Sequence, residues 1–79
     1  MVKNISNIEE NLAKIAAKIK QLRKDKGYSS YETFALDHDL DRKQYWRIEK
    51  GANVTIATLL KILAIHQISL KDFFDNLEI

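Results

Sequence analysis

The chain has 79 residues, of which 46% are hydrophobic, and a formal net charge of +2 at pH 7. A chain of this length can build only one small core, so we expect a single domain over residues 1–79. Because cysteine is absent, a disulfide framework and a thiolate metal site are both excluded. The sequence has neither a signal-peptide pattern nor an apolar run that could span a bilayer, and we expect a cytoplasmic protein.

Chain breakers are few, since proline is absent and the two glycines are Gly27 and Gly51. With little strand-like alternation, this composition predicts an all-α fold. We expect a first helix over about residues 7–26, beginning at a capping-box pair, Ser6 and Glu9, and ending near Gly27. Its apolar face repeats every three or four residues and comprises Ile5, Ile8, Leu12, Ile15, Ile19 and Leu22.

The next two helices are expected to be short and closely spaced. A second helix is expected over about residues 30–38, with either Ser29 or Ser30 as its N-cap. Three or four residues later, Asp41 is placed to cap a third helix. A short helix, a tight turn and another helix form a helix-turn-helix, which we expect over about residues 30–50.

The last part of the chain predicts two more helices. Gly51 is expected to end the third helix in the left-handed conformation, where a Cβ atom is unfavourable. Thr55 is then placed to cap a fourth helix, and Ser69 a fifth. The apolar residues expected on the buried sides of these helices are Ile56, Leu59, Leu60, Ile62, Leu63, Leu70, Phe73 and Phe74.

Charge is segregated along the chain. Residues 14–26 carry six basic residues and one acid, and residues 42–50 carry four basic residues and one acid. Residues 32–41, by contrast, carry four acids and no Lys or Arg. On the third helix, basic side chains and one aromatic share a face, namely Arg42, Lys43, Trp46, Arg47 and Lys50. Lys43 and Arg47 repel each other at i,i+4 spacing, and we expect no acid on that face to relieve them. The pattern indicates an anionic partner.

A cationic helix that follows a tight turn has the geometry of a recognition helix in the major groove of DNA. Arginine and lysine side chains donate there to guanine O6 and N7. The alternative is a charged face that only contacts water.

Catalysis is not indicated by any motif. The sequence has no Gly-rich phosphate loop and no Ser-His-Asp set that can be argued, so we expect neither an enzyme nor a bound cofactor. His38 and His66 have no partner at metal-ligand spacing, and we expect no metal site.

Three stretches carry a resemblance to a known family. They are IKQLRKDKG in the first helix, ETFALDHDLDRKQYWRIEKG across the second and third, and TIATLLKILAIHQISLKDFF across the last two. Together they resemble the Cro/C1-type, or lambda-repressor-like, helix-turn-helix domains, over about residues 12–75. The resemblance implies a five-helix fold, here with an extended N-terminal helix. It also implies a sequence-specific transcriptional regulator whose third helix, about residues 42–50, reads the major groove.

The resemblance also implies roles for single residues. Base-edge contacts are expected from Arg42, Lys43, Trp46 and Arg47. Phosphate contacts are expected from Ser30, Tyr31, Gln44, Lys50, Asn53 and Thr55, although Thr55 could also be a plain N-cap. Arg23 and Glu49 resemble a family pair in which a partly buried ion pair ties the first helix to the third, so both are expected to be structural, as is Gly51.

Three positions depart from the family pattern. Tyr31 stands where a glutamine usually braces a phosphate and the recognition helix; its hydroxyl can bond a phosphate but cannot make the two-ended amide contact. Asp39 replaces the usual turn glycine, in a conformation that Asp tolerates better than most residues. His38 replaces a small apolar residue, and the chain before the second helix is one residue longer.

The expected partner is double-stranded DNA, bound by a possible homodimer because one recognition helix covers only a few base pairs. Ile5 and Ile8 extend the apolar register and form either a seam between two copies or a cover over Phe74 and Leu77 of the last helix. The alternative function is a protein-interaction adaptor or an antitoxin-like module with the same fold.

Overall fold

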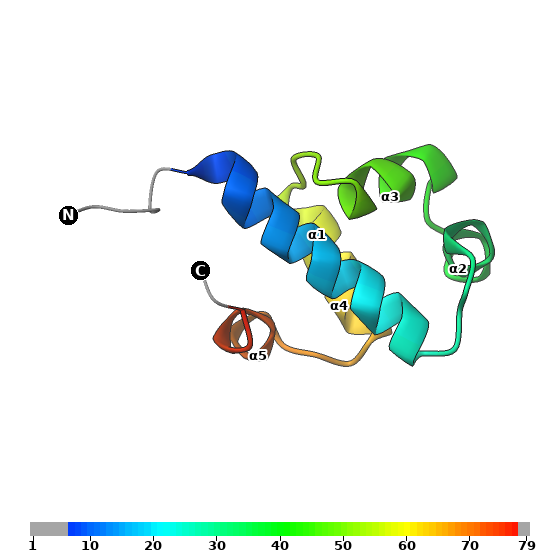
Figure 1. Cartoon of the computed structure of the whole chain (residues 1–79). Helices are drawn as coiled ribbons and strands as arrows, with labels where there is room; N and C mark the ends of the chain where they lie inside the picture. Colours follow the sequence, from blue (N-terminus) through cyan, green and yellow to red (C-terminus); the bar gives the residue numbers. More distant parts are fainter. Residues whose placement is uncertain (1–6, 78–79) are drawn as a thin grey trace.

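The computed structural model describes residues 7–77, and every regular element in that range is a helix. The helices in chain order are α1 (Ile8–Asp25), α2 (Tyr31–Asp37), α3 (Arg42–Glu49), α4 (Ile56–Ile65) and α5 (Leu70–Asp75). Figure 1 shows α2 and α3 at one end of the molecule and α5 toward the other. The expected all-α class with five helices is confirmed.

A side-chain cap begins each helix. The cap of α1 is Asn7, whose Oδ1 accepts a hydrogen bond from the Glu10 N–H at 3.0 Å. The expectation of Ser6 was therefore wrong by one residue, because the adjacent Asn7 satisfies the free N–H of the first turn; Ser6 itself lies outside the described residues. Of the two candidates for α2, Ser30 is the cap rather than Ser29. The caps of the remaining helices are the expected Asp41, Thr55 and Ser69.

Residues in the left-handed conformation lie on either side of α3. Asp39, in the turn between α2 and α3, has φ 58°. Gly51 has φ 98° and follows α3 in a Schellman arrangement, in which the Ala52 N–H donates to the Arg47 carbonyl at 2.9 Å. Both turns were expected; the left-handed Gln67 after α4, at φ 57°, was not.

All five helices contribute to one apolar core. Its buried members are Ile19, Phe34, Ala35, Tyr45, Ile48, Leu59, Ile62, Leu63 and Phe73. The expectation was wrong for Ile56 and Leu60, which are 59% and 46% exposed. Each residue turns the helix by about 100°, so Leu60 points away from the buried face formed by Leu59, Ile62 and Leu63. Ile56 is the first residue of α4.

An aromatic cluster surrounds Phe34 in this core. The rings of His38 and Tyr45 lie 4.7 and 5.1 Å from it, and His66 stacks on it at 5.4 Å with an interplanar angle of 7°. The Nε2 atom of His66 is buried and has no hydrogen-bond partner within residues 7–77. Burial lowers the pKa of His66, and the charge of Lys26 and the neighbouring His38 lower it further.

We predict that acid destabilises the protein through His66. The ordinary pKa of histidine is about 6.5, and a lower folded-state pKa means that the unfolded chain binds the proton first. The free energy of unfolding should therefore fall as pH decreases below about 6.5. His66→Phe keeps a ring on Phe34 without a titrating group. Urea denaturation between pH 7 and pH 5 should give a shallower pH dependence for the variant, and equal slopes would contradict the prediction.

Candidate nucleic-acid interface

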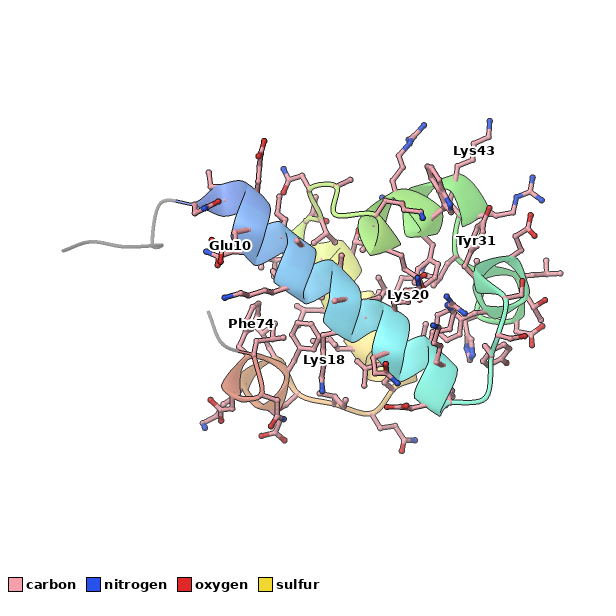
Figure 2. All side chains as sticks on the ribbon, viewed as in Figure 1. Glu10, Lys18, Lys20, Tyr31, Lys43 and Phe74 are labelled. Atoms are coloured by element: carbon pink, nitrogen blue, oxygen red, sulfur yellow. The ribbon has the colours of Figure 1, made fainter. Side chains whose placement is uncertain are left out.

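Helix α3 has a buried side and an exposed side. Tyr45 and Ile48 are 1% and 3% exposed and hold α3 against the core. The opposite side carries the expected set, in which all five residues are exposed: Arg42, Lys43, Trp46, Arg47 and Lys50. Figure 2 shows the Lys43 side chain extending away from the body of the molecule. The helix therefore presents a cationic surface that the rest of residues 7–77 leaves exposed.

The exposed residues form two rows along α3. Lys43 and Arg47 make one row at i,i+4 spacing, and Arg42, Trp46 and Lys50 make the other. Trp46 is 43% exposed, and the Lys50 Nζ lies 5.6 Å from the centre of its ring, within cation–π range. An apolar ring thus interrupts a row of cations.

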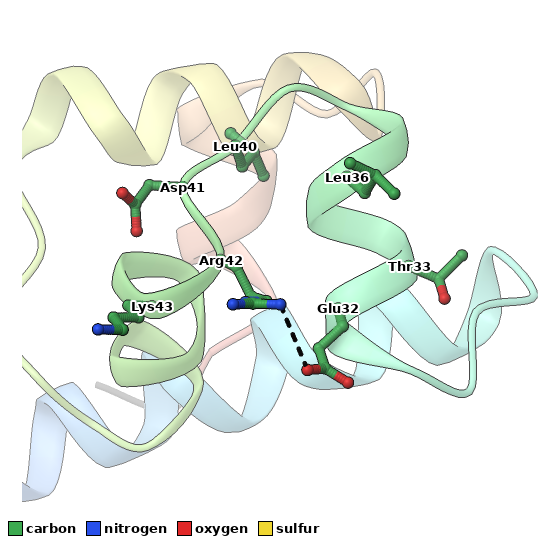
Figure 3. Close-up of a pocket in the computed structure, with 7 residues that line it drawn as sticks. All are labelled: Glu32, Thr33, Leu36, Leu40, Asp41, Arg42 and Lys43. Carbon is green, nitrogen blue, oxygen red and sulfur yellow. Dashed lines mark ion pairs between the residues drawn. The ribbon is translucent and has the colours of Figure 1, made fainter.

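An acid from the preceding helix reaches this surface. The Arg42 Nη1 atom lies 3.9 Å from the Glu32 Oε2 atom, and both side chains are more than half exposed. Figure 3 shows the Arg42 guanidinium directed toward Glu32 across the groove between α2 and α3. The sequence did not indicate this pair, because helical periodicity detects neighbours on one helix and not across a turn. A pair this exposed is weak, so Arg42 can exchange Glu32 for another acceptor.

The expected phosphate contacts lie mainly near helix N-termini, where free N–H groups favour anions. Ser30 and Tyr31 begin α2 and are half-buried, Gln44 is in the first turn of α3, and Asn53 and Thr55 precede α4. The remaining expected contact, Lys50, ends α3.

Two of these hydroxyls already serve as helix caps. The Thr55 hydroxyl caps α4 and also donates to the Thr58 Oγ1 at 3.0 Å. A phosphate at that position would therefore meet backbone N–H groups rather than the Thr55 hydroxyl proton. The Ser30 hydroxyl accepts from the Thr33 N–H at 3.2 Å, which leaves its own proton able to donate.

A buried ion pair positions α3 relative to α1. Arg23 donates from Nε and Nη2 to the two carboxylate oxygens of Glu49 at 2.8 and 3.0 Å. The two side chains are 5% and 6% exposed. The hydrogen bond to Glu49 raises the pKa of Arg23, and burial raises the pKa of the adjacent Tyr45 hydroxyl. Arg23 and Glu49 thus lie in the interior and away from the cationic surface, as the resemblance implied.

One member of this network was not found from the sequence. The Tyr28 carbonyl accepts a third hydrogen bond from Arg23, at 2.8 Å, and the Tyr28 hydroxyl donates to Asp37 at 2.8 Å. Tyr28 lies in the loop between α1 and α2, where no periodicity identifies partners.

The comparisons with known proteins identify a relative. "Control protein C.MunI" of Mycoplasma sp is 45% identical over 62 residues, which cover 77% of this chain and 84% of the relative. No family model matches the chain, and no solved structure matches it significantly. The chain belongs to the Cro/C1-type helix-turn-helix family.

This Cro/C1-type protein is a DNA-binding transcriptional regulator, as the resemblance implied, which favours that function over the adaptor alternative. Its relative is named a control protein and not an enzyme. Among the described residues, no helix is long and apolar enough to cross a membrane. The same part of the chain has no group of three or more side chains suited to hold a metal ion.

We predict a large and non-additive cost for breaking the buried ion pair. Arg23→Met or Glu49→Leu alone leaves one buried charge without its partner and should lower the free energy of unfolding by about 3–5 kcal/mol. The double variant should lose less than the sum of the two single losses. Urea denaturation of all four proteins measures both quantities. Strictly additive losses would show that the two residues do not act as a pair.

Proposed function

We propose that the protein is a sequence-specific regulator that places α3 in the major groove and reads base edges with Arg42, Lys43, Trp46 and Arg47. The observation that carries this proposal is the two-sided character of α3. Its apolar side is fixed in the core, and its exposed side carries four cations and one aromatic ring. Arginine and lysine match guanine, so the preferred site should contain guanine in each half-site.

Phosphate contacts would set the position of α3 in the groove. We assign these to residues on or next to the ends of α2, α3 and α4, namely Ser30, Tyr31, Gln44, Lys50, Asn53 and Thr55. Such contacts carry no sequence information directly, and they make affinity fall as salt increases.

We further propose that the protein binds as a homodimer to two half-sites about one turn of DNA apart, since one recognition helix covers few base pairs. Ile8 is 68% exposed at the start of α1, which argues against its folding over α5 and supports a seam between copies. Ile5, the other expected member of that seam, lies outside the described residues.

The proposal also covers the domain organisation, the ligands and the location of the protein. The whole chain acts as one domain, without a cofactor, a small-molecule substrate or catalytic activity, and its site of action is the DNA in the cytoplasm. Its similarity to a relative named a control protein supports a regulatory role.

We predict that exposed cations of α3 differ in their effect on specificity. Once random-site selection has defined the preferred sequence, Arg42→Ala or Arg47→Ala should cost about 1–3 kcal/mol on that sequence and relax the base preference. Lys50→Ala, at the end of the same helix, is the matched control and should weaken binding to all sequences alike. Equal losses on selected and random DNA for all three variants would count against base reading by α3.

We predict that Ile5→Lys combined with Ile8→Lys leaves the fold intact, weakens binding to DNA with two half-sites and spares a single half-site. The control is Leu60→Lys, which changes an exposed apolar residue on α4. Sedimentation gives the number of protein copies per DNA, and circular dichroism checks the fold. One copy per DNA on every selected site, or a defect confined to Leu60→Lys, would rule out the N-terminal seam.

A further inference from the structure

A cleft opens between the start of α2 and the exposed side of α3. It encloses about 250 Å³ and is lined by Tyr31, Glu32, Arg42, Lys43 and Trp46. Figure 2 shows Tyr31 and Lys43 on the same edge of the molecule. The cleft therefore combines two aromatic side chains, two cations and one carboxylate.

The aromatic side chains are the unusual part of this cleft. Trp46 is the only tryptophan of the chain, and it is 43% exposed within a row that otherwise carries cations. The other large apolar residues of α3, Tyr45 and Ile48, are buried on the opposite side of the helix. A large ring left in water on the proposed DNA-reading surface is stabilised when an apolar group covers it.

The chemistry of the major groove limits what that apolar group can be. The edges of guanine, adenine and cytosine present polar donors and acceptors, whereas the C5-methyl group of thymine is apolar. A methyl group at the same C5 position of cytosine offers identical apolar chemistry.

We infer that Tyr31 and Trp46 form a binding site for the 5-methyl group of a pyrimidine. This inference rests on the proposed function and adds a ligand class to it. Trp46 contacts the methyl group, and Tyr31 closes the other side of the cleft. The Arg42 Nη1 atom lies 3.9 Å from the Glu32 carboxylate, on the side of α3 that faces α2. The thymine O4 atom beside the methyl group can accept from Arg42, and the corresponding cytosine amine can donate to Glu32.

The test removes or adds the methyl group without changing base pairing. In the selected duplex, each thymine is replaced in turn by uracil, and each cytosine in turn by 5-methylcytosine, and affinities are measured by fluorescence anisotropy. For the wild-type protein, one position per half-site should show an affinity three- to fivefold higher with the methyl group than without it, which corresponds to about 0.8 kcal/mol for one buried methyl-sized group. Sensitivity to uracil identifies thymine as the ligand, and sensitivity to 5-methylcytosine identifies the methylated cytosine.

Variants of Trp46 link the effect to the cleft. Trp46→Ala should bind the methylated and unmethylated duplexes equally, and Trp46→Phe, which retains an aromatic ring, should keep part of the difference. As a second readout, 5-bromouracil at the sensitive position should photocrosslink to Trp46, which peptide mass spectrometry locates. Because the side chain is exposed, these variants should melt within a few degrees of the wild type.

Two outcomes separate the inference from the function on which it rests. Binding with a clear base preference but without any methyl sensitivity, or methyl sensitivity that persists in Trp46→Ala, overturns the methyl site alone. The absence of any base preference in random-site selection overturns the proposed function and the methyl site together.

Discussion

The buried pair of Arg23 and Glu49 is the constraint on which the geometry of the proposed DNA-reading surface depends. Glu49 is the last residue of α3, and Arg23 lies in the last turn of α1, so the pair joins the ends of these two helices. Two charges with such low exposure require each other, because neither recovers its lost hydration elsewhere. The pair also uses the Tyr28 carbonyl, which connects the loop before α2 to the same point.

On α3, the residues that stabilise the fold differ from those proposed to contact DNA. Tyr45, Ile48 and Glu49 hold it in place, whereas the exposed residues contact little of the protein and can be reoriented by a ligand. Arg42 illustrates this freedom, because its pairing with Glu32 is long and solvent-exposed. On such a helix the exposed residues can be substituted without loss of the buried contacts that hold the fold.

The departures from the family pattern affect the fold and the surface differently. Asp39 adopts the left-handed conformation for which the family usually has glycine, so the turn survives the substitution. Tyr31 in place of the usual glutamine changes the surface, because it adds a second aromatic side chain to the cleft that contains Trp46. His38 takes its place beside Phe34, where its ring adds to the aromatic cluster.

The sequence by itself determined the helical class, the order of the helices and the left-handed residue Gly51 that ends α3. It also determined four of the five N-caps, although at α2 it left a choice between two serines. These features are local, because capping, periodicity and turn conformation depend on residues at most a few positions apart. The Arg23–Glu49 pair spans 26 positions, so only the resemblance to a family indicated it. The contact between Glu32 and Arg42 and the exposure of Ile56 were decided by tertiary structure alone. Both depend on how the helices are oriented relative to one another, which no pattern along a single helix contains.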